Sequence, residues 1–280
     1  MTDADPSIAA ATLSWHDQNA RDLPWRRTRD PYRIWVSEIM LQQTRVDTAM
    51  EFYGRFFKRF QTVHDLAEAP LGDVLKAWEN MGYYARARNL HKASKEIVAR
   101  FEGVLPDTVE ELESLPGIGP YTARAVASIA FDLPVAPVDA NIKRVVARLK
   151  GIDAPIDQAA TRQRIEDLAA TLVPVKDAGL FNQALMDLGS VVCTPSTPQC
   201  HACPLPTYCR ALEKGMQDSI PVTTRRKPIP HKQITGAIIV SSRGNLLLAR
   251  RPLDGFLGGL WKLPGGEKKI GESLKAALTR

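Results

Sequence analysis

Leu115-Pro116-Gly117-Ile118-Gly119-Pro120 is the stretch of this 280-residue chain that decides its fold. It follows an amphipathic segment that ends near Leu115 and precedes a second helical stretch, Tyr121 to Phe131, for which Pro120 suits the first turn. Two glycines around one apolar residue let the backbone turn tightly and direct amide N–H groups outward, which is how a phosphate is held without side-chain charge. The stretch therefore predicts a helix-hairpin-helix, although a plain helix–helix turn would also favour Gly and Pro.

The body of the chain, up to about residue 212, is predicted to be all-α. Its apolar residues recur at spacings of three and four, Pro and Gly interrupt them, and no lasting period-two pattern appears. The formal net charge is +6, but residues 225–280 alone carry 12 Lys and Arg against 3 Asp and Glu. Because the basic excess lies in the tail, net charge is a poor argument that the body binds nucleic acid.

The N-terminal segment bears on localisation. It carries Asp3 and Asp5 rather than a basic region before an apolar one, and the chain has no run of eighteen apolar residues. These features argue against export and against a membrane partner. We therefore expect a cytoplasmic protein, in which thiols stay available for metal.

Asp139 is the first candidate catalytic residue. It lies twenty residues after Gly119, in Val138-Asp139-Ala140-Asn141, and precedes the helical run Ile142 to Leu149. A carboxylate at an N-cap accepts backbone N–H groups and is stabilised by the helix dipole, so Asp139 should stay ionised. A capping role alone would explain it. An ionised carboxylate is also what a developing oxocarbenium ion at a sugar carbon needs nearby, and both roles can hold together.

Glu38 is the second candidate. The apolar stripe of a helix that starts at Asp30-Pro31 runs from Ile34 to Val46 and surrounds Glu38 with apolar neighbours. Partial desolvation raises the pKa of a carboxyl group, which then can hold and deliver a proton as a general acid. An exposed Glu38 paired with Arg33 or Arg45 is the alternative that spacing alone leaves open.

The chain's four cysteines lie close together, as Cys193-x6-Cys200-x2-Cys203-x5-Cys209. Thiols packed this closely indicate one shared metal centre, since structural thiols scatter along a sequence. Tetrahedral zinc sites usually show two Cys-x-x-Cys pairs, whereas cubane iron–sulfur clusters accept irregular runs. On chemistry alone, zinc and an iron–sulfur cluster remain open.

Several further segments occur in a characteristic order. They are Leu23-Pro24-Trp25-Arg26, Asp30-Pro31-Tyr32, Trp35-Val36-Ser37-Glu38-Ile39-Met40-Leu41-Gln42-Gln43-Thr44, Met81-Gly82-Tyr83-Tyr84-Ala85-Arg86, the hairpin, Val138-Asp139-Ala140-Asn141, Phe181-Asn182-Gln183-Ala184-Leu185-Met186-Asp187-Leu188-Gly189 and the four cysteines. Together, over roughly residues 15 to 210, they resemble the MutY family of adenine DNA glycosylases, a branch of the endonuclease III superfamily. The bifunctional endonuclease III branch carries a nucleophilic lysine where this chain has Tyr121, so the resemblance implies no Schiff base here.

This resemblance implies roles for individual residues. A flipped adenine would enter a pocket, where Glu38 would protonate its N7 and later serve the water, and Asp139 would stabilise the sugar cation. Tyr121 and Asn141 would support the two carboxylates. The adenine would be bound by Trp25, Arg26 and Gln183, and the DNA would be contacted by Gln43, Thr44, Tyr83, Gly117, Ile118 and Gly119. The cysteine spacing resembles the family's cluster loop and implies a [4Fe-4S] cluster on Cys193, Cys200, Cys203 and Cys209.

A second domain is expected after a linker at residues 214–231, which is rich in Pro, carries the basic run Arg225-Arg226-Lys227 and lacks apolar periodicity. Ile234 to Val240 and Asn245 to Ala249 read as the strands of a hairpin. The stretch Gly258 to Gly266 resembles the Nudix-like domain that the MutY family carries, and Gly266-x5-Glu272-x7-Arg280 follows the opening of a Nudix box. The acidic residues that would hold Mg²⁺ in such a box would lie beyond Arg280.

We therefore expect an all-α, two-lobed glycosylase domain at residues 1–213 with an iron–sulfur loop at 193–209, the linker, and a partial α/β Nudix-like domain at 232–280. The resemblance implies a monomeric, nucleoid-associated enzyme that hydrolyses the N-glycosidic bond of adenine mispaired with 8-oxoguanine or guanine in double-stranded DNA. An endonuclease III-like pyrimidine glycosylase is the nearest alternative, against which Tyr121 and Gln42-Gln43-Thr44 argue. A nucleotide hydrolase acting through the Nudix-like segment and a non-catalytic DNA-binding or redox protein are the others.

Overall fold

The computed structural model describes residues 6–224, 230–252, 255 and 257–279. The chain divides into two compact units, one formed by residues 1–81 and 86–224 and the other by residues 82–85 and 225–280. The basic run Arg225-Arg226-Lys227 and the Nudix-box position Arg280 lie outside the described residues. Each unit is described by itself.

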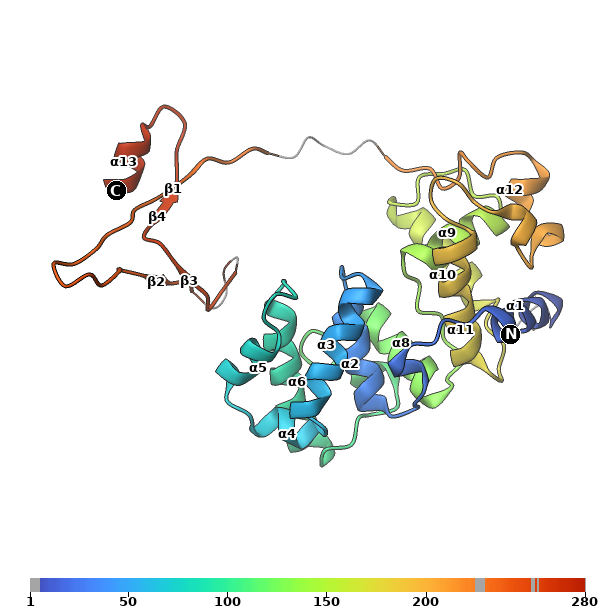
Figure 1. Cartoon of the computed structure of the whole chain (residues 1–280). Helices are drawn as coiled ribbons and strands as arrows, with labels where there is room; N and C mark the ends of the chain where they lie inside the picture. Colours follow the sequence, from blue (N-terminus) through green and yellow to red (C-terminus); the bar gives the residue numbers. More distant parts are fainter. Residues whose placement is uncertain (1–5, 225–229, 253–254, 256, 280) are drawn as a thin grey trace. The chain divides into compact units, whose positions relative to one another are not determined.

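The first unit is helical and has two lobes, as predicted (Figure 1). One lobe contains α2 (Pro31–Leu41), α3 (Val46–Arg59), α4 (Val63–Glu68), α5 (Leu71–Ala77), α6 (Ala85–Phe101), α7 (Val109–Glu113) and α8 (Pro120–Phe131). The other contains α1 (Pro6–Asn19), α9 (Ala140–Leu149), α10 (Ala159–Ala170), α11 (Ala178–Asp187), the π-helix η2 (Leu188–Val192), the short 3-10 helices η3 (Cys200–Ala202) and η4 (Pro206–Tyr208), and α12 (Arg210–Glu213). Helix α8 packs against both α2 and α11 and so joins the lobes.

The helix boundaries next to the site follow from local sequence. Helix α8 begins at Pro120 directly after Gly119, and α9 begins after Asp139, as the sequence predicts. The apolar stripe through Val46 was expected to lie on one helix, but α2 ends at Leu41. The chain then turns through Gln43, whose φ of 55° lies in the left-handed region, and Val46 starts α3. This break exposes a turn directly after the helix that carries Glu38.

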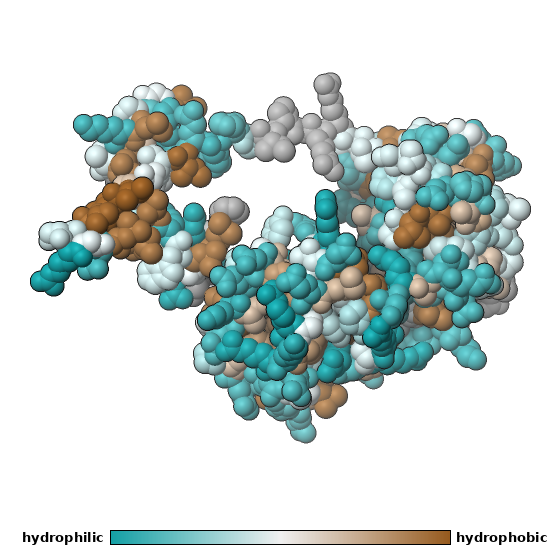
Figure 2. Space-filling model, in the orientation of Figure 1, coloured by the Kyte–Doolittle hydropathy of each residue, from teal (hydrophilic) through white to brown (hydrophobic). Residues whose placement is uncertain are grey.

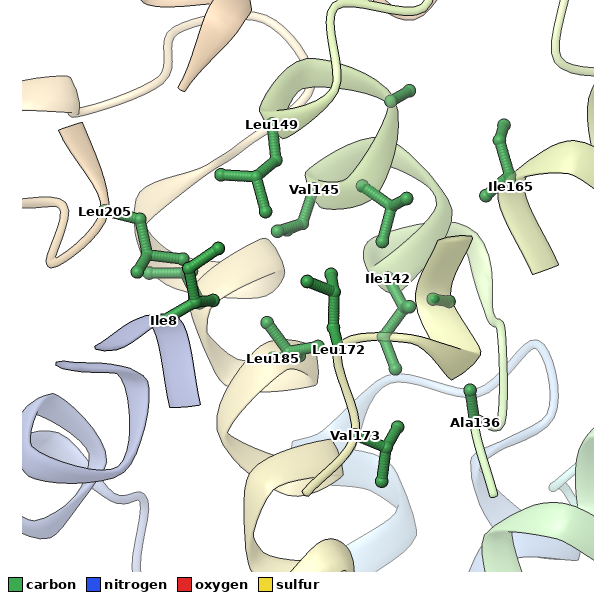
Figure 3. Packing of buried hydrophobic residues seen from close by; sticks show 14 of the residues in the cluster. Ile8, Ala136, Ile142, Val145, Leu149, Ile165, Leu172, Val173, Leu185 and Leu205 are labelled. Carbon is green, nitrogen blue, oxygen red and sulfur yellow. The ribbon is translucent and has the colours of Figure 1, made fainter. Parts of the chain in front are cut away.

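The two lobes have different cores. In the first lobe, aromatic rings stack edge to face along α3, with Phe56 contacting Trp78 and Phe57 contacting Tyr32. In the second lobe, Figure 3 shows aliphatic side chains from α1, α9, α10 and α11 converging. Both cores are closed, because Phe56 and Trp78 in one and Ile142 in the other are 0% exposed. Rigid walls on both sides can therefore hold a site between the lobes.

The first unit continues to Thr224, whereas the sequence placed the start of the linker at 214. Ile220 is 1% exposed, and its carbonyl accepts a 2.7 Å hydrogen bond from Nε of Arg148. Ile156 N donates to Val222 O at 2.9 Å. These contacts attach residues 216–224 to the second lobe. In the described part of the chain, no helix is long and apolar enough to cross a membrane.

The second unit contains short antiparallel strand pairs. Strand β1 (Ile234–Gly236) pairs with β4 (Gly265–Glu267), β2 (Ala249–Arg250) pairs with β3 (Trp261–Lys262), and α13 (Leu274–Thr279) follows. The predicted hairpin turn is present, since Val240 bridges Leu246, but the regular strands are shorter than predicted and pair with later residues. Apolar side chains gather on the surface of this unit (Figure 2); Ile238 and Trp261 are 76% and 64% exposed.

Candidate active site and cysteine loop

Nine of the residues singled out from the sequence line a single cavity of about 380 Å³ in the first unit. They are Trp25, Arg26, Glu38, Gln43, Thr44, Tyr121, Asp139, Asn141 and Gln183. They come from α2 and the turn after it, from the starts of α8 and α9, from the 3-10 helix η1 (Pro24–Arg26) and from α11. The fold therefore brings together residues that are up to 158 positions apart in the chain. The hairpin, Tyr83 and the four cysteines lie outside this cavity.

Glu38 is buried at the cavity wall, with 6% of its surface exposed. Its Oε2 accepts a 3.0 Å hydrogen bond from the hydroxyl of Tyr121. Burial and, to a smaller extent, the charge of Asp139 raise the pKa of Glu38 to about 7, against the opposing effects of the hydrogen bond from Tyr121 and the charge of Arg26. The alternative of an exposed, paired Glu38 does not hold, since Arg33 pairs with Asp30 instead. A carboxyl group with this pKa can both give and take a proton near neutral pH.

Asp139 caps α9, as predicted. Its Oδ1 accepts a 2.7 Å bond from Ile142 N, and its Oδ2 accepts a 2.9 Å bond from Nδ2 of Asn141. The expected lowering of its pKa by the cap is not the net effect. Burial raises the pKa of Asp139, and the bonds from Ile142 and Asn141 only oppose that rise. Asn141 is itself held, because its Oδ1 accepts a 2.9 Å bond from Nη2 of Arg144.

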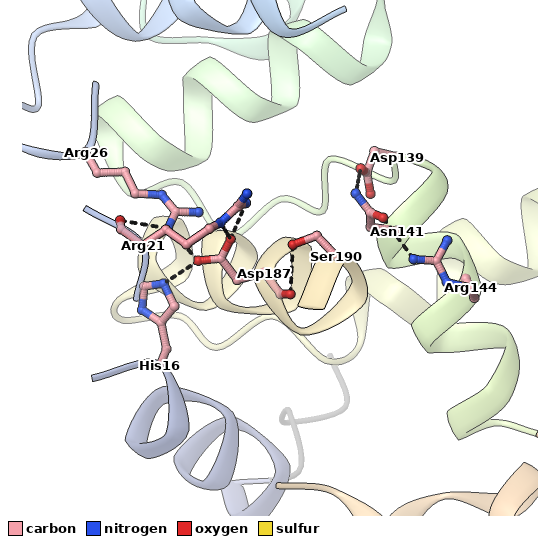
Figure 4. Close-up of polar contacts among 8 residues, drawn as sticks. All are labelled: His16, Arg21, Arg26, Asp139, Asn141, Arg144, Asp187 and Ser190. Carbon is pink, nitrogen blue, oxygen red and sulfur yellow. Dashed lines mark hydrogen bonds and ion pairs between the residues drawn. The ribbon is translucent and has the colours of Figure 1, made fainter. Parts of the chain in front are cut away.

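Arg26 reaches the cavity from η1 and is anchored by a residue that the sequence reasoning missed. Asp187, at the end of α11, is 1% exposed and accepts a 2.5 Å bond from Nη1 of Arg26. Its other oxygen accepts bonds of 2.8 Å and 2.5 Å from Nε and Nη2 of Arg21. Nε2 of His16 lies 3.4 Å from the oxygen that Arg26 contacts (Figure 4). An acidic residue inside the apolar run from Ala184 to Leu188 was the available signal. Arg21 also lines the cavity.

The predicted base-binding residues differ in how open they are. Trp25 is 6% exposed and packs edge-on against Tyr53, with ring centroids 5.4 Å apart. Trp25 therefore forms part of the cavity wall and does not present a free ring face for stacking. Gln183 is half-buried on α11, in the same turn as the fully buried Asn182, whose Nδ2 donates to Val135 O at 2.8 Å.

The turn after α2 is held by Arg86. Its Nη1 donates to the carbonyls of Ile39 at 3.0 Å and Gln42 at 2.5 Å, and to Oγ1 of Thr44 at 3.2 Å. These bonds satisfy carbonyls that a helix C-terminus leaves unpaired. The Thr44 hydroxyl is thus engaged within the protein, while the adjacent Gln43 side chain is exposed. Arg86, the last residue of the Met81–Arg86 motif, therefore orders this turn.

The other predicted DNA contacts are on the surface. Gly117 and Gly119 are exposed, whereas the Ile118 side chain is 5% exposed and its amide donates to Leu115 O at 3.2 Å. Gly117 needs its φ of 79°, and a Cβ there would lie 2.5 Å from Cβ of Asn89. Tyr83 is 59% exposed with a φ of 45°, so core packing does not explain it.

The four cysteines line a second, smaller cavity together with Arg148. Nη1 of the buried Arg148 donates to Sγ of Cys193 at 3.3 Å, and Leu205 N donates to Sγ of Cys203 at 3.4 Å. Among the described residues, no three His, Cys, Asp or Glu side chains are grouped closely enough to hold a single metal ion. Four sulfurs around one cavity, two of them accepting N–H bonds, are a donor set that suits a thiolate-bound cluster.

Comparison with known proteins decides the family. Residues 36–171 match the model of the HhH-GPD superfamily of base excision DNA repair proteins. The adenine DNA glycosylase of Mycolicibacterium smegmatis is 42% identical over 72% of this chain and 69% of its own length. The chain belongs to the adenine DNA glycosylase family. The family predicted from the sequence motifs is therefore confirmed.

Relatives and solved structures extend this finding. The rat adenine DNA glycosylase is 36% identical over 90% of the chain, which spans only 59% of that relative's length. A thermostable thymine-DNA glycosylase superposes with a TM-score of 0.68 at 32% identity, covering 74% of this chain and 95% of that one. An endonuclease III–DNA complex superposes with a TM-score of 0.62 at 25% identity, covering 76% and 98%. These matches confirm the predicted helix-hairpin-helix fold of the first unit.

Proposed function

We propose that the chain is a monofunctional DNA glycosylase that hydrolyses the N-glycosidic bond of adenine mispaired with 8-oxoguanine or guanine. The observation that carries this proposal is the pair of carboxylates, Glu38 and Asp139, in one cavity of a chain whose relatives are adenine DNA glycosylases. The environments of the two groups differ. Glu38 is buried beside a phenol, and Asp139 is held by an amide and a helix N-terminus.

The proposed chemistry uses these two environments. Glu38, whose pKa is raised to about 7, is largely protonated below that pH. It gives its proton to N7 of a flipped adenine, and the bond from C1′ to N9 then breaks, so that adenine leaves. The electron pair of that bond goes to the base. The carboxylate of Asp139 stabilises the positive charge on the sugar. Glu38, now ionised, takes a proton from water as the water oxygen bonds to C1′, which leaves an abasic site and restores the acid.

Surrounding residues would bind and orient the substrate. Arg26 can donate to the adenine edge because Asp187 holds its guanidinium at the cavity wall. Gln183 offers an amide that can donate and accept. Trp25 contributes an apolar part of the cavity wall next to Arg26.

DNA binding is proposed for three exposed segments, each taken by itself. In the first unit, the Gln43 turn would enter the base stack near the opposing 8-oxoguanine, and the hairpin at 117–119 would hold a phosphate at the start of α8. Tyr83, which belongs to the second unit, is proposed on the resemblance to have the same role as Gln43. The likeness to an endonuclease III–DNA complex supports this proposal. Residues 232–280 are still proposed to be part of a Nudix-like domain.

The product identifies the reaction type. Tyr121 offers no amine, and its hydroxyl is engaged by Glu38, so a Schiff base with the sugar cannot form at this position. We expect an abasic strand that stays intact until treated with alkali or heat, and no covalent complex on borohydride reduction. Denaturing gels of a labelled A:8-oxoguanine duplex, with and without alkali, measure both. Strand cleavage without alkali by the purified protein would contradict this assignment.

We further propose that Cys193, Cys200, Cys203 and Cys209 hold a [4Fe-4S] cluster. The four thiols share one cavity, and the hydrogen bonds to Cys193 and Cys203 suit thiolate ligands. When bound, the cluster would cross-link the loop 193–209 to itself. The residues of this loop would then present a fixed backbone to α9, since Arg144 Nε donates to Cys193 O at 2.7 Å.

The cluster assignment predicts the metal content. Purified protein should be brown and contain four iron atoms and four inorganic sulfides per chain, as expected for Cys₄ ligation of this cluster. Cys203→Ala should lower iron content and weaken DNA binding more than it slows base release in the bound complex. Iron analysis and binding titrations measure these effects. Colourless, fully active protein that contains one zinc ion per chain would refute the assignment.

A further inference from the structure

A π-helical turn lies between the cavity of Glu38 and Asp139 and the cavity of the four cysteines. Helix α11 runs directly into the π-helix Leu188–Val192, and Cys193 N donates to Leu188 O at 2.7 Å across five residues. Such turns are rare and are frequently found at functional sites. Here the turn lies between Asp187, which anchors Arg26, and the first cysteine of the loop. We therefore consider which contacts the residues of this turn make.

Gly189, in this turn, lies against Asn141 without space for a side chain. A Cβ at Gly189 would lie 2.6 Å from Cβ of Asn141 and 3.1 Å from its Cα. Real Cβ atoms essentially never lie within 3.0 Å of such a neighbour, and Cβ of Asn141 is fixed directly to the backbone of α9 rather than being the end of a flexible side chain. Gly189 is not among the glycines with positive φ. Close packing, and not backbone conformation, is therefore what requires glycine here.

The same residue also contacts α9 through its carbonyl. The Gly189 oxygen accepts a 2.5 Å bond from Nη2 of Arg144, and that nitrogen donates to Oδ1 of Asn141 at 2.9 Å. Asn141 in turn donates to Oδ2 of Asp139 at 2.9 Å. Gly189 thus limits the position of Asn141 from one side and of its partner Arg144 from the other. Figure 4 shows Asn141 between Asp139 and Arg144.

We propose that Gly189 is a positioning residue for base release: its missing side chain sets the separation between the π-turn and the first turn of α9, and so places Asn141 against Asp139. This inference rests on the proposed function insofar as its test measures the rate of adenine release. The contact itself does not depend on that function. No residue larger than glycine fits unless α9 moves at Asn141.

Gly189→Ala tests the proposal. The added methyl group must displace the first turn of α9, and a misplacement of about 1 Å can cost about 10²-fold in rate. We expect the single-turnover rate of adenine release to fall by roughly that factor. The dissociation constant for an A:8-oxoguanine duplex should change little, since no proposed DNA contact lies in the π-turn. A variant that folds and reacts at the wild-type rate would overturn the proposal.

Two other glycines provide matched controls. A Cβ at Gly54 in α3 meets nothing within 4 Å, so Gly54→Ala should leave the rate unchanged and, because alanine favours a helix interior over glycine by about 1 kcal/mol, should not lower the melting temperature. A Cβ at Gly179 would lie 2.3 Å from Ser128 O, so Gly179→Ala crowds α11, the helix that leads into the π-turn, against α8. Gly179→Ala should lower the melting temperature, but the folded protein should keep most of the single-turnover rate of adenine release. An equal loss of rate in Gly179→Ala would show that any crowding of α11 slows the reaction, and would refute a specific role for Gly189.

A readout without catalysis separates this inference from the proposed function. The amide of Ile142 is protected by its bond to Asp139, so its hydrogen exchange should accelerate in Gly189→Ala and not in Gly179→Ala. If Gly189→Ala does not fold, adding Asn141→Gly removes the facing Cβ and should restore folding. No rescue, or unchanged exchange at Ile142, would contradict the proposed contact. Wild-type protein that releases no adenine would refute the proposed function, while the exchange test would still apply.

Discussion

Replacing Glu38 with Gln is expected to reduce adenine release by about 10²–10⁴-fold, the usual value of general acid–base assistance. The amide keeps the size of the carboxyl group, and its oxygen can still accept the bond from Tyr121, but it has no acidic proton to deliver. Single-turnover rates on an A:8-oxoguanine duplex measure the loss. Glu96→Gln is the control: Glu96 is half-buried in α6, pairs with Arg100 away from the cavity, and its substitution should leave the rate at the wild-type value.

Stability and pH distinguish this effect from damage to the fold. In the folded protein the pKa of Glu38 is raised to about 7, whereas in the unfolded chain Glu38 has its ordinary, lower pKa. The folded state therefore loses stability as the pH rises from that ordinary pKa toward 7, and Glu38→Gln removes this loss. Glu38→Gln should therefore be at least as stable as the wild type at pH 8. The wild-type rate should fall above about pH 7, where Glu38 loses its proton. Wild-type turnover in the folded variant would show that Glu38 is not the acid.

Asp187→Asn should produce the largest loss of stability, on the order of 3 kcal/mol. Breaking a buried ion pair by removing one partner typically costs about 3–5 kcal/mol, and we expect the lower end because the Arg21 side chain is 34% exposed. The substitution keeps the size of the side chain but removes the charge that holds Arg21 and Arg26. Urea unfolding measures the change. Asp22→Asn, which breaks an exposed ion pair with Arg27, should change stability little.

The same residue predicts how stability responds to acid. Bonds from His16 and Arg26 and the charges of Arg26 and Arg21 hold the pKa of Asp187 well below its usual value, against the effect of burial. A carboxyl group with a lowered pKa stabilises the folded state above its unfolded pKa of about 3.9 and loses that contribution as pH falls. The stability difference between wild type and Asp187→Asn should therefore shrink below about pH 4. A difference that is the same at pH 7 and pH 3 would contradict the buried ion-pair assignment.

Local sequence rules predicted the parts of the site that depend on neighbours in the chain. The cap at Asp139, the start of α8 at Pro120 and the hairpin glycines each follow from residues within one or two helical turns. The burial of Glu38 was predictable from its apolar neighbours in α2. Its raised pKa followed from that burial.

Long-range contacts were not predictable in this way. Nothing in the local pattern pairs Asp187 with Arg21 and Arg26, which lie more than 160 residues earlier. Nor does it show that the Arg86 side chain donates to the carbonyls at the end of α2. The net rise in the pKa of Asp139 also depends on its burial, because the cap alone would lower that pKa. Such effects arise only when the two lobes come together.

Base release is the most direct test that the cavity of Glu38 and Asp139 acts on adenine. Single-turnover assays should compare duplexes that place A, T, U or thymine glycol opposite 8-oxoguanine or G, with released bases separated and quantified. The proposed function predicts release of free adenine from the A:8-oxoguanine and A:G duplexes and no release of the pyrimidines. Release of thymine, uracil or thymine glycol in preference to adenine, or no adenine release by folded protein, would contradict it.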